Sequence, residues 1–286
     1  MKKIAILGTG LMGKAIAERL LERRCALAVF NRTKHKAVPL KKRGAGIANS
    51  PREAIEKADC VLLVLADHKA ILEIFHAIPS EVFKGKNFIQ MGTIAPSESV
   101  KLKETISRRG GEYCEAPVLG SIKEVLAGKL FIMFGGTRKQ FDRWRGFLKI
   151  FDPQPHYIGK VGQAAVLKLA LNHLIAAHAV SFSTSLGIVQ KNGIDADIFM
   201  DILRQSSLYA PMVDKKLPNW RKHVYRPVNF PVKHLLKDIN LILKEVKRLK
   251  IQTGAVQAVR RLLMRSVQEG YKDLDYSAVF ETVNRL

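Results

Sequence analysis

Residues 3–16 read KIAILGTGLMGKAI, and a glycine-rich turn at 8–13 separates two differently patterned segments. The apolar run 3–8 predicts a strand, and apolar residues at helical spacing from Leu11 to Leu20 predict a helix directly after the turn. A G-x-G-x-x-G turn in this setting is typical of a dinucleotide-binding βαβ unit. Its glycines allow a tight turn, a close approach of the backbone to a pyrophosphate, and close contact between helix and strand. The free N–H groups at the helix start would bind the diphosphate, so the predicted binding residues are Gly8, Gly10, Leu11, Met12 and Gly13.

Strands and helices alternate through the first half of the chain. Further apolar runs at 25–31, 59–66, 87–92, 112–118 and 129–136 predict strands. Ser50, Pro51 and Glu53 have the positions of an N-cap, a first helical residue and a capping box, and another helix is expected around 138–150. This alternation predicts a Rossmann-type, doubly wound α/β domain over residues 1–160.

The second half of the chain reads as helices only. Strand signals end after Gly162, and helices are expected at 163–191, 195–205, 231–250 and 253–269, with loops at Gly193, Pro211, Pro218 and Pro227. We therefore predict an all-helical domain over residues 161–286. Its uncharged stretch 169–189 is long enough to span a bilayer, but it contains an asparagine, two histidines and several serines. We interpret it as the buried helix of a soluble protein.

Composition sets broad limits on the class of protein. The chain has 286 residues, 47% of them hydrophobic, and a formal net charge of +23. A lysine-rich surface is the plain interpretation of this charge, and an anionic ligand or a nucleic-acid partner is the alternative. Three separated cysteines without a C-x-x-C pair or a Cys/His cluster predict reduced thiols in the cytoplasm and no metal site. The N-terminus lacks the continuous apolar core of a signal peptide.

The end of the second predicted strand indicates which dinucleotide binds. Enzymes that use NAD have an acidic residue there, whereas this chain has Asn31, Arg32 and Thr33. A guanidinium and a hydroxyl can bind a 2′-phosphate that no carboxylate repels, so we predict NADP(H); a basic surface loop is the alternative. The predicted cofactor site also includes Leu65 and Ala66, at the end of the apolar run 59–66.

Four stretches of the chain resemble the β-hydroxyacid dehydrogenase family, which includes 3-hydroxyisobutyrate dehydrogenases and glyoxylate/succinic semialdehyde reductases. GTGLMGKAIAERLL (8–21) is similar to the family's N-terminal fingerprint, and EAPVLGS (115–121) to its substrate-loop motif. GKVGQAAVLKLALN (159–172) resembles the catalytic motif, and NFPVKHLLKDINLIL (229–243) resembles the late motif, especially as glyoxylate reductases show it. The resemblance extends over the whole chain.

The resemblance implies roles for particular residues. Lys168 would be the catalytic lysine, Asn172 the catalytic asparagine beside it, and Lys237 a residue near the cofactor. The residues that would bind the substrate or line its pocket are Thr93, which also lies near the nicotinamide, Gly120, Ser121, Phe230 and Asp238. The chain departs from the family where Leu119 replaces a common serine, and where Gln90 and Gly92 replace the usual Asp and Ser.

The lysine can be interpreted without the family. Lys168 is the only formally charged residue between Val161 and Gln190, and it shares a helix face with Asn172 four residues later. An ammonium near a carbonyl that receives hydride stabilises the charge on oxygen and supplies a proton. The alternative is a lysine whose ammonium reaches out from a helix surface into water.

These observations predict an NADPH-dependent reductase of a small aldehyde or keto acid, glyoxylate or succinic semialdehyde, that works as a homodimer or homotetramer. Oxidation of a β-hydroxyacid, as by 3-hydroxyisobutyrate dehydrogenase, is the enzymatic alternative. A dinucleotide-sensing protein that binds nucleic acid is the alternative from another class; it is motivated by the charge of +23. Lys168 and Asn172 argue against it, because a sensor needs no proton donor.

Overall fold

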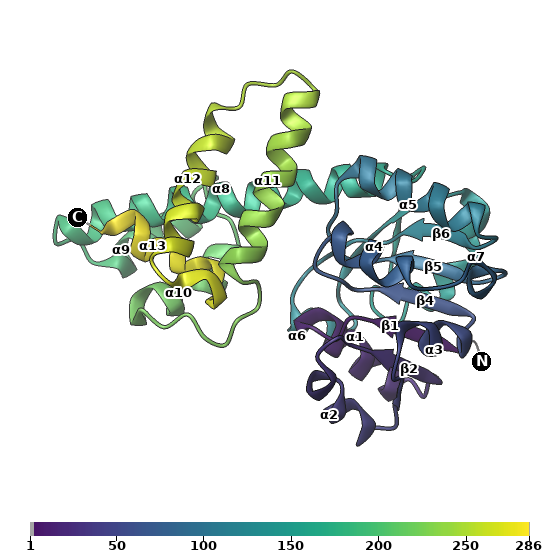
Figure 1. Ribbon diagram of the computed structural model, residues 1–286. Coiled ribbons are helices and arrows are strands. Elements are labelled where there is room, and N and C mark those ends of the chain that lie inside the picture. Colours follow the sequence, from purple (N-terminus) through teal and green to yellow (C-terminus); the bar gives the residue numbers. More distant parts are fainter. Residues whose placement is uncertain (1–2, 286) are drawn as a thin grey trace. The chain divides into compact units, whose positions relative to one another are not determined.

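The computed structural model describes residues 3–285 (Figure 1). They form two compact units that divide between Lys168 and Leu169, inside one long helix. The first unit contains the sheet, and the second consists of helices and short 3₁₀ turns, apart from a single bridge between Pro231 and Asp275. Among the described residues, the predicted Rossmann-type domain followed by a helical domain is confirmed.

The sheet has the strand order β3-β2-β1-β4-β5-β6-β8-β7, and β9 pairs with β8. Strands β1 to β6 pair in parallel, whereas β8 pairs antiparallel with β6 and β7. The strands are β1 Ile4–Leu7, β2 Leu27–Phe30, β3 Gly46–Ile47, β4 Cys60–Leu63, β5 Asn87–Gln90, β6 Glu112–Glu115, β7 Val118–Leu119, β8 Phe131–Gly135 and β9 His156–Gly159. The order reverses between β1 and β4, and at such a point open α/β sheets bind their ligands.

Helices cover both faces of the sheet. Alternate residues of a strand point to opposite faces: Ile4 and Ile6 pack in one core cluster, and Ala5 and Leu7 pack in the other. The first cluster includes residues of α1 Leu11–Glu22, α6 Ile122–Ala127 and α7 Arg138–Leu148. The second includes residues of α3 Pro51–Glu56, α4 His68–His76 and α5 Pro96–Arg108. The short helix α2 Val38–Lys41 follows β2.

Local signals in the sequence explain where these helices begin. At α3, the Ser50 hydroxyl accepts a 3.1 Å hydrogen bond from the Glu53 N–H, and the Glu53 carboxylate accepts a 2.7 Å bond from the Asn49 N–H. The predicted N-cap at Ser50 is confirmed, but the capping box is not formed as predicted, because Glu53 accepts from the N–H of Asn49 and not from that of Ser50. At α4, the Asp67 carboxylate accepts a 2.8 Å bond from the Ala70 N–H. Each cap satisfies an N–H that the first helical turn leaves without a partner.

Within the described residues, the second unit is built from five helices and most of a sixth. They are α8 Gln163–Lys191, α9 Ala196–Gln205, α10 Met212–Lys222, α11 Val232–Arg248, α12 Gly254–Gln268 and α13 Val279–Asn284. Helices α11 and α12 lie side by side (Figure 1). By length and composition α8 could cross a membrane, and 39% of its most apolar window is buried within the structure. The interpretation of this helix as part of a soluble protein stays a prediction.

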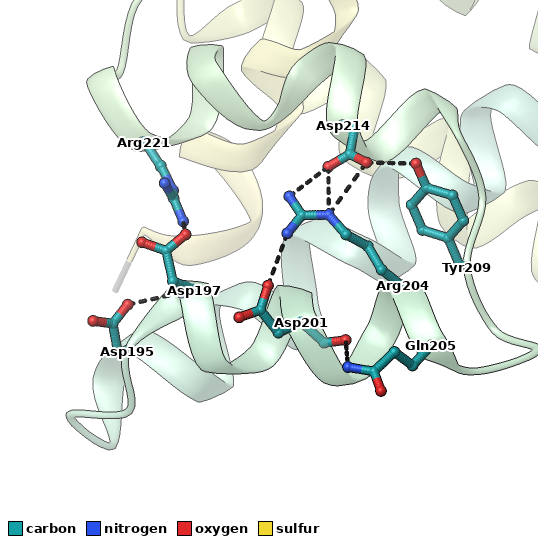
Figure 2. A network of polar contacts seen from close by, with 8 residues as sticks. All are labelled: Asp195, Asp197, Asp201, Arg204, Gln205, Tyr209, Asp214 and Arg221. Atoms are coloured by element: carbon teal, nitrogen blue, oxygen red, sulfur yellow. Dashed lines mark hydrogen bonds and ion pairs between the residues drawn. The ribbon is translucent and has the colours of Figure 1, made fainter.

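A polar network connects α9 with α10 (Figure 2). The Arg204 guanidinium lies 2.8 Å from the Asp214 carboxylate and 3.0 Å from that of Asp201. The Tyr209 hydroxyl donates a 2.5 Å hydrogen bond to Asp214. Arg204 and then Tyr209 hold the pKa of Asp214 below its usual range. Because Arg204 and Asp201 are exposed to water, their ion pair contributes little to the stability of the fold.

The expectation of a loop at Pro218 is wrong. Proline lacks the N–H that a helix interior needs, so the sequence predicts a break there, yet Pro218 lies inside α10. Tertiary contacts outweigh this cost, because Val213, Leu217 and Trp220 of the same helix are buried. The Trp220 indole also donates a 2.9 Å hydrogen bond to the carbonyl of Ser277.

Candidate functional site

The glycine turn has the geometry that a diphosphate needs. Gly8 has a φ of +100°, and a Cβ at Gly13 would lie 2.0 Å from the Gly8 carbonyl oxygen. A Cβ at Gly10, by contrast, would meet nothing within 4 Å, so the backbone is open on that side. Helix α1 begins at Leu11 with neither a side-chain cap nor an acidic residue in its first turn. Its first N–H groups are therefore available to an anion.

Other predicted cofactor residues lie at the same edge of the sheet. Leu65 follows β4 in the chain. A Cβ on Gly8 would lie 3.1 Å from the Leu65 side chain. A Cβ at Gly92 would lie only 2.6 Å from the Leu65 carbonyl oxygen. This contact explains why glycine stands where the family usually has serine. Ala66 is exposed beside Leu65, just before the N-cap of α4.

The three residues after β2 differ in what their side chains are free to do. The Asn31 side chain accepts a 2.9 Å hydrogen bond from the Thr9 N–H and donates a 3.0 Å bond to the Thr33 carbonyl, so it shapes this turn. The Arg32 side chain is 90% exposed, and its guanidinium lies 3.7 Å from the Glu73 carboxylate of α4. Thr33 is exposed and precedes a 3₁₀ turn, Lys34–Lys36. Glu73, a carboxylate close to the predicted phosphate-binding arginine, cannot be recognised from the sequence around Arg32.

Lys168 and Thr93 line one small pocket in the first unit. The other lining residues are Gln90, Gly92, Ile94, Glu115, Pro117 and Ala165. The structure thus brings the predicted proton donor together with the residue expected near the nicotinamide. Gln90 is buried, and its amide donates a 3.1 Å hydrogen bond to the Gly92 carbonyl, while its side-chain oxygen has no hydrogen-bond partner among the described residues.

A buried carboxylate that the sequence analysis did not assign lies in the same pocket. Glu115, at the end of β6, is 1% exposed and pairs in register with Gln90 on β5. One of its oxygens accepts hydrogen bonds from three backbone N–H groups at the start of α8. Burial raises the pKa of Glu115 above its usual range, although these bonds and one from Ser99 act in the opposite direction. Its place as the first residue of the substrate-loop motif EAPVLGS is the signal that could have identified it.

The predicted carboxylate-binding residues lie at the start of α6. Gly120 has a φ of +135°, which favours glycine. The N–H and the hydroxyl of Ser121 both donate to the Glu124 carboxylate, at 2.8 and 2.5 Å. A substrate carboxylate that binds here would therefore compete with Glu124 for these two donors.

In the second unit, Asn172, Lys237 and Asp238 form a cluster. Asn172 donates a 2.6 Å hydrogen bond to Asp238, and the Lys237 ammonium lies 2.8 Å from the other Asp238 oxygen. Asn172 follows Lys168 by one turn of α8, so both positions lie on one side of this helix. Phe230 has separate contacts, since its ring meets Tyr276 edge-on with the centroids 6.0 Å apart.

Residues 3–285 contain no group of three or more His, Cys, Asp or Glu side chains placed to hold a metal ion. The candidate site residues of the first unit are the glycine turn, the turn after β2 and the Lys168 pocket. The second unit contains the Asn172 cluster.

Comparison with known proteins gives matches along nearly the whole chain. A family model for the NAD binding domain of 6-phosphogluconate dehydrogenase matches residues 3–159, and a model described as NAD-binding of NADP-dependent 3-hydroxyisobutyrate dehydrogenase matches 162–283. Glyoxylate/succinic semialdehyde reductase 1 of Arabidopsis thaliana is 32% identical, with 98% of each chain covered. The chloroplastic reductase 2 of the same plant is 31% identical over 98% of this chain and 79% of its own.

The fold also matches solved structures. The 3-hydroxyisobutyrate dehydrogenase of Mycobacterium tuberculosis, solved with L-serine, superposes with a TM-score of 0.88 over the full length of both chains. The two sequences are only 21% identical, so this likeness supports the fold alone.

Proposed function

The chain belongs to the β-hydroxyacid dehydrogenase family, and from this premise we propose that it is an NADPH-dependent reductase of a small aldehyde or keto acid. The family makes it an oxidoreductase that binds a nicotinamide dinucleotide. The observation that supports the reaction most directly is the pocket in which Lys168 lies with Thr93, in the unit that contains the dinucleotide-binding turn.

The chain's own residues would bind, orient and move a proton. The open backbone at Gly10 and the free N–H groups of α1 would hold the diphosphate. When bound, the dihydronicotinamide supplies a hydride to the carbonyl carbon of the substrate. The carbonyl oxygen then gains an electron pair, and the Lys168 ammonium would stabilise that charge and give the oxygen a proton. The neutral amine that remains would regain its proton from water.

The preference for NADPH over NADH is supported by the turn after β2. No carboxylate stands at 31–33, and the Arg32 guanidinium is exposed to a ligand. Glu73 acts against this preference because it lies 3.7 Å from Arg32. A 2′-phosphate carries more charge than one carboxylate and can accept several donors, so it would compete successfully for the guanidinium. The description of the second family model, which names an NADP-dependent enzyme, supports the same choice.

The proposed substrates are glyoxylate and succinic semialdehyde, which the names of the Arabidopsis relatives carry. Both carry a carboxylate and a reducible aldehyde, and the chain's charge of +23 favours anions. The N–H and hydroxyl of Ser121 are donors for that carboxylate once Glu124 releases them. Oxidation of a 3-hydroxyisobutyrate-type acid is the second candidate, supported by the name of the second family model.

The test is a screen of NADPH oxidation with glyoxylate, succinic semialdehyde, other short keto acids and butanal. We expect the two aldehyde acids to give kcat/KM values at least about tenfold above that of butanal, which lacks the acid. Equal values for butanal and succinic semialdehyde would contradict carboxylate recognition. DNA binding that weakens with salt, without NADPH oxidation by any acid, would favour the nucleic-acid alternative.

A further inference from the structure

We infer that Glu115 is a positioning residue, which fixes the first turn of α8 and through it the place of Lys168 in the pocket. This inference rests on the proposed function, because it concerns the lysine that would donate the proton. Both oxygens of Glu115 accept hydrogen bonds from α8 or from Ser99, so it would act on the reaction through Lys168. By fixing the first turn of α8, the Glu115 carboxylate would determine the position of the Lys168 ammonium in the pocket.

The contacts between Glu115 and α8 are specific. Glu115 Oε1 accepts hydrogen bonds from the N–H groups of Gly162 at 2.8 Å, Ala164 at 2.9 Å and Ala165 at 3.2 Å. These are N–H groups that the start of a helix leaves without an internal partner. Ala165 precedes Lys168 by three residues, so both lie on one helix face, and both line the pocket. A shift of this turn would therefore move the lysine directly.

The other carboxylate oxygen ties Glu115 to α5. Ser99 of α5 donates a hydrogen bond from its hydroxyl to Glu115 Oε2, and the same hydroxyl lies 2.8 Å from the Tyr113 hydroxyl. Ser99 is fully buried, and Tyr113 is 3% exposed. The carboxylate thus links α8, α5 and β6 in an arrangement that water does not reach. Through this linkage, the position of Lys168 depends on the position of the sheet edge.

The structure leaves room for this carboxylate at a specific place. A Cβ at Gly135 of β8 would lie 2.5 Å from Glu115 Oε1 and 2.7 Å from its Cγ. Any residue larger than glycine would displace the side chain. The glycine of β8 and the glutamate of β6 are therefore parts of one arrangement.

An ordinary helix cap does not require a buried carboxylate from a distant strand. Caps usually come from the residue just before the helix and use a small, partly exposed Ser, Thr, Asp or Asn. Here the cap comes from a strand 47 to 50 residues away in sequence, and it is a buried carboxylate. Burying a carboxylate is costly even when it is hydrogen-bonded. The buried carboxylate connects the sheet edge, where Gln90 and Glu115 lie, to the helix that carries Lys168. This connection explains why a buried carboxylate is present despite its energetic cost.

The test compares three variants by kcat, KM and the binding of NADPH. Glu115→Ala removes all the contacts, and Glu115→Asp is one methylene too short to keep them without a shift of α8. We expect kcat to fall by about 10- to 100-fold in Glu115→Ala and by about tenfold in Glu115→Asp, since a displacement of about 1 Å can cost 10²-fold. The Kd for NADPH and the KM should stay within about threefold of wild type. Glu115→Gln keeps an oxygen for the three N–H groups and should keep kcat within about threefold.

A further readout separates position from stability. NADPH carrying the transferred deuterium at C4 should give a larger isotope effect on kcat in Glu115→Asp than in wild type, because the chemical step becomes slower. Mere loss of folded enzyme would lower kcat and leave the isotope effect unchanged. The matched control is Ser50→Ala, which removes the cap of α3 outside this pocket and should leave kcat of the folded enzyme unchanged.

The outcomes distinguish this inference from the proposed function. Wild-type kcat and an unchanged isotope effect in folded Glu115→Asp, together with a strong loss in Lys168→Ala, would overturn the positioning role alone. An active Lys168→Ala enzyme would overturn the proposed function as well. If Glu115→Ala does not fold, the Asp and Gln variants decide, because both keep a polar group at this position.

Discussion

Asn172 of α8 donates a 2.6 Å hydrogen bond to Asp238 of α11, and both side chains are 1% exposed. The Lys237 ammonium reaches the other oxygen of the same carboxylate at 2.8 Å. The two positions that the resemblance assigned to the active site therefore depend on one another structurally. Whatever else they do, each is the buried polar partner of the other.

This pairing predicts strong coupling between Asn172 and Asp238 in stability. Asn172→Ala and Asp238→Ala should each lower the free energy of unfolding by about 1.5–3 kcal/mol, the usual value for a hydrogen bond to a charged group. The double variant should be less destabilised than the sum, because either change alone leaves a buried polar partner behind. Urea denaturation of the four proteins measures this cycle. Strictly additive losses would show that the bond contributes nothing specific.

Lys168→Ala should lower kcat by roughly 10²–10⁴-fold, which is the contribution of a positioned acid–base group. The Kd for NADPH should stay nearly unchanged, since the glycine turn and the turn after β2 are not altered. Lys160→Ala is the control, because Lys160 is exposed and precedes α8 in the chain. Steady-state kinetics and a binding titration give both quantities. A Lys168→Ala enzyme with near-wild-type kcat would rule out the lysine as proton donor.

Glu115 should make stability depend on pH in a particular direction. Burial, the main cause, raises its pKa above the ordinary value, which is about 4.3 in an unfolded chain. The native state then holds the proton more tightly than the unfolded state does. Its contribution to stability is fully present below about pH 4.3 and is lost as the pH rises through the higher native pKa.

Glu115→Gln cannot ionise and should lack this loss. The stability of Glu115→Gln relative to wild type should therefore increase as the pH rises from about 4. The groups that face the carboxylate are unchanged in this variant: Ser99, Tyr113, the three N–H groups of α8, and Lys168 in the same pocket. Urea midpoints of both proteins across this pH range give the difference. A difference that stays flat or decreases would contradict the raised pKa.

The chain should assemble as a homodimer or homotetramer through the second unit. Ile194, Ile198 and Ile202 follow one another at intervals of four residues, at and just before α9, and are 50%, 58% and 65% exposed. An apolar stripe of this kind is typical of an interface. Replacing Ile198 and Ile202 by aspartate should reduce the mass measured by light scattering to that of one 32.0 kDa chain. Val38→Asp, a change at an apolar residue 50% exposed in the first unit, should leave the assembly intact. A monomeric wild type would refute the prediction.

Features that depend on neighbouring residues were predictable from the sequence. The strand, turn and helix around Gly8 follow from periodicity and glycine spacing within 20 residues, and the structure confirms them. The cap of α3 at Ser50 follows from Ser50, Pro51 and Glu53, which lie within four positions of one another. Helix α10 was not predicted, because Pro218 is a strong local breaker and the contacts that override it come from distant residues such as Ser277.

The site shows the same limit. The contacts of Glu115 with α8 and α5, and that of Glu73 with Arg32, join residues far apart along the chain, so no local pattern reveals them. Gly92 appeared in the sequence only as a departure from the serine usual in the family, whereas the structure shows that a Cβ there would lie 2.6 Å from the Leu65 carbonyl oxygen. Asn31 lies at the expected place after β2, but its side chain is hydrogen-bonded to the backbone of Thr9 and Thr33 within the turn.

Arg32 should set the preference for NADPH over NADH, and the structure limits the size of its contribution to NADPH affinity. Its side chain is 90% exposed and lies 3.7 Å from Glu73, so a contact with phosphate would be partly screened and would replace an existing weak ion pair. We therefore expect Arg32→Ala to weaken NADPH binding by about tenfold, the lower end of what a charged hydrogen bond contributes, at about 1.4 kcal/mol per decade. NADH, which lacks the phosphate, should bind nearly as before.

Glu73→Gln provides the opposite test of the same contact. Removing this carboxylate frees Arg32 and removes a like charge from the phosphate, so NADPH should bind a few-fold more tightly while NADH changes little. Arg108→Ala, at an arginine 78% exposed on α5, is the control for a general loss of positive charge. Specificity constants for both cofactors, measured at low and high salt, complete the experiment, since screening should reduce the wild-type preference. Parallel losses for NADPH and NADH in Arg32→Ala would show that Arg32 supports the fold or the adenine and does not recognise the phosphate.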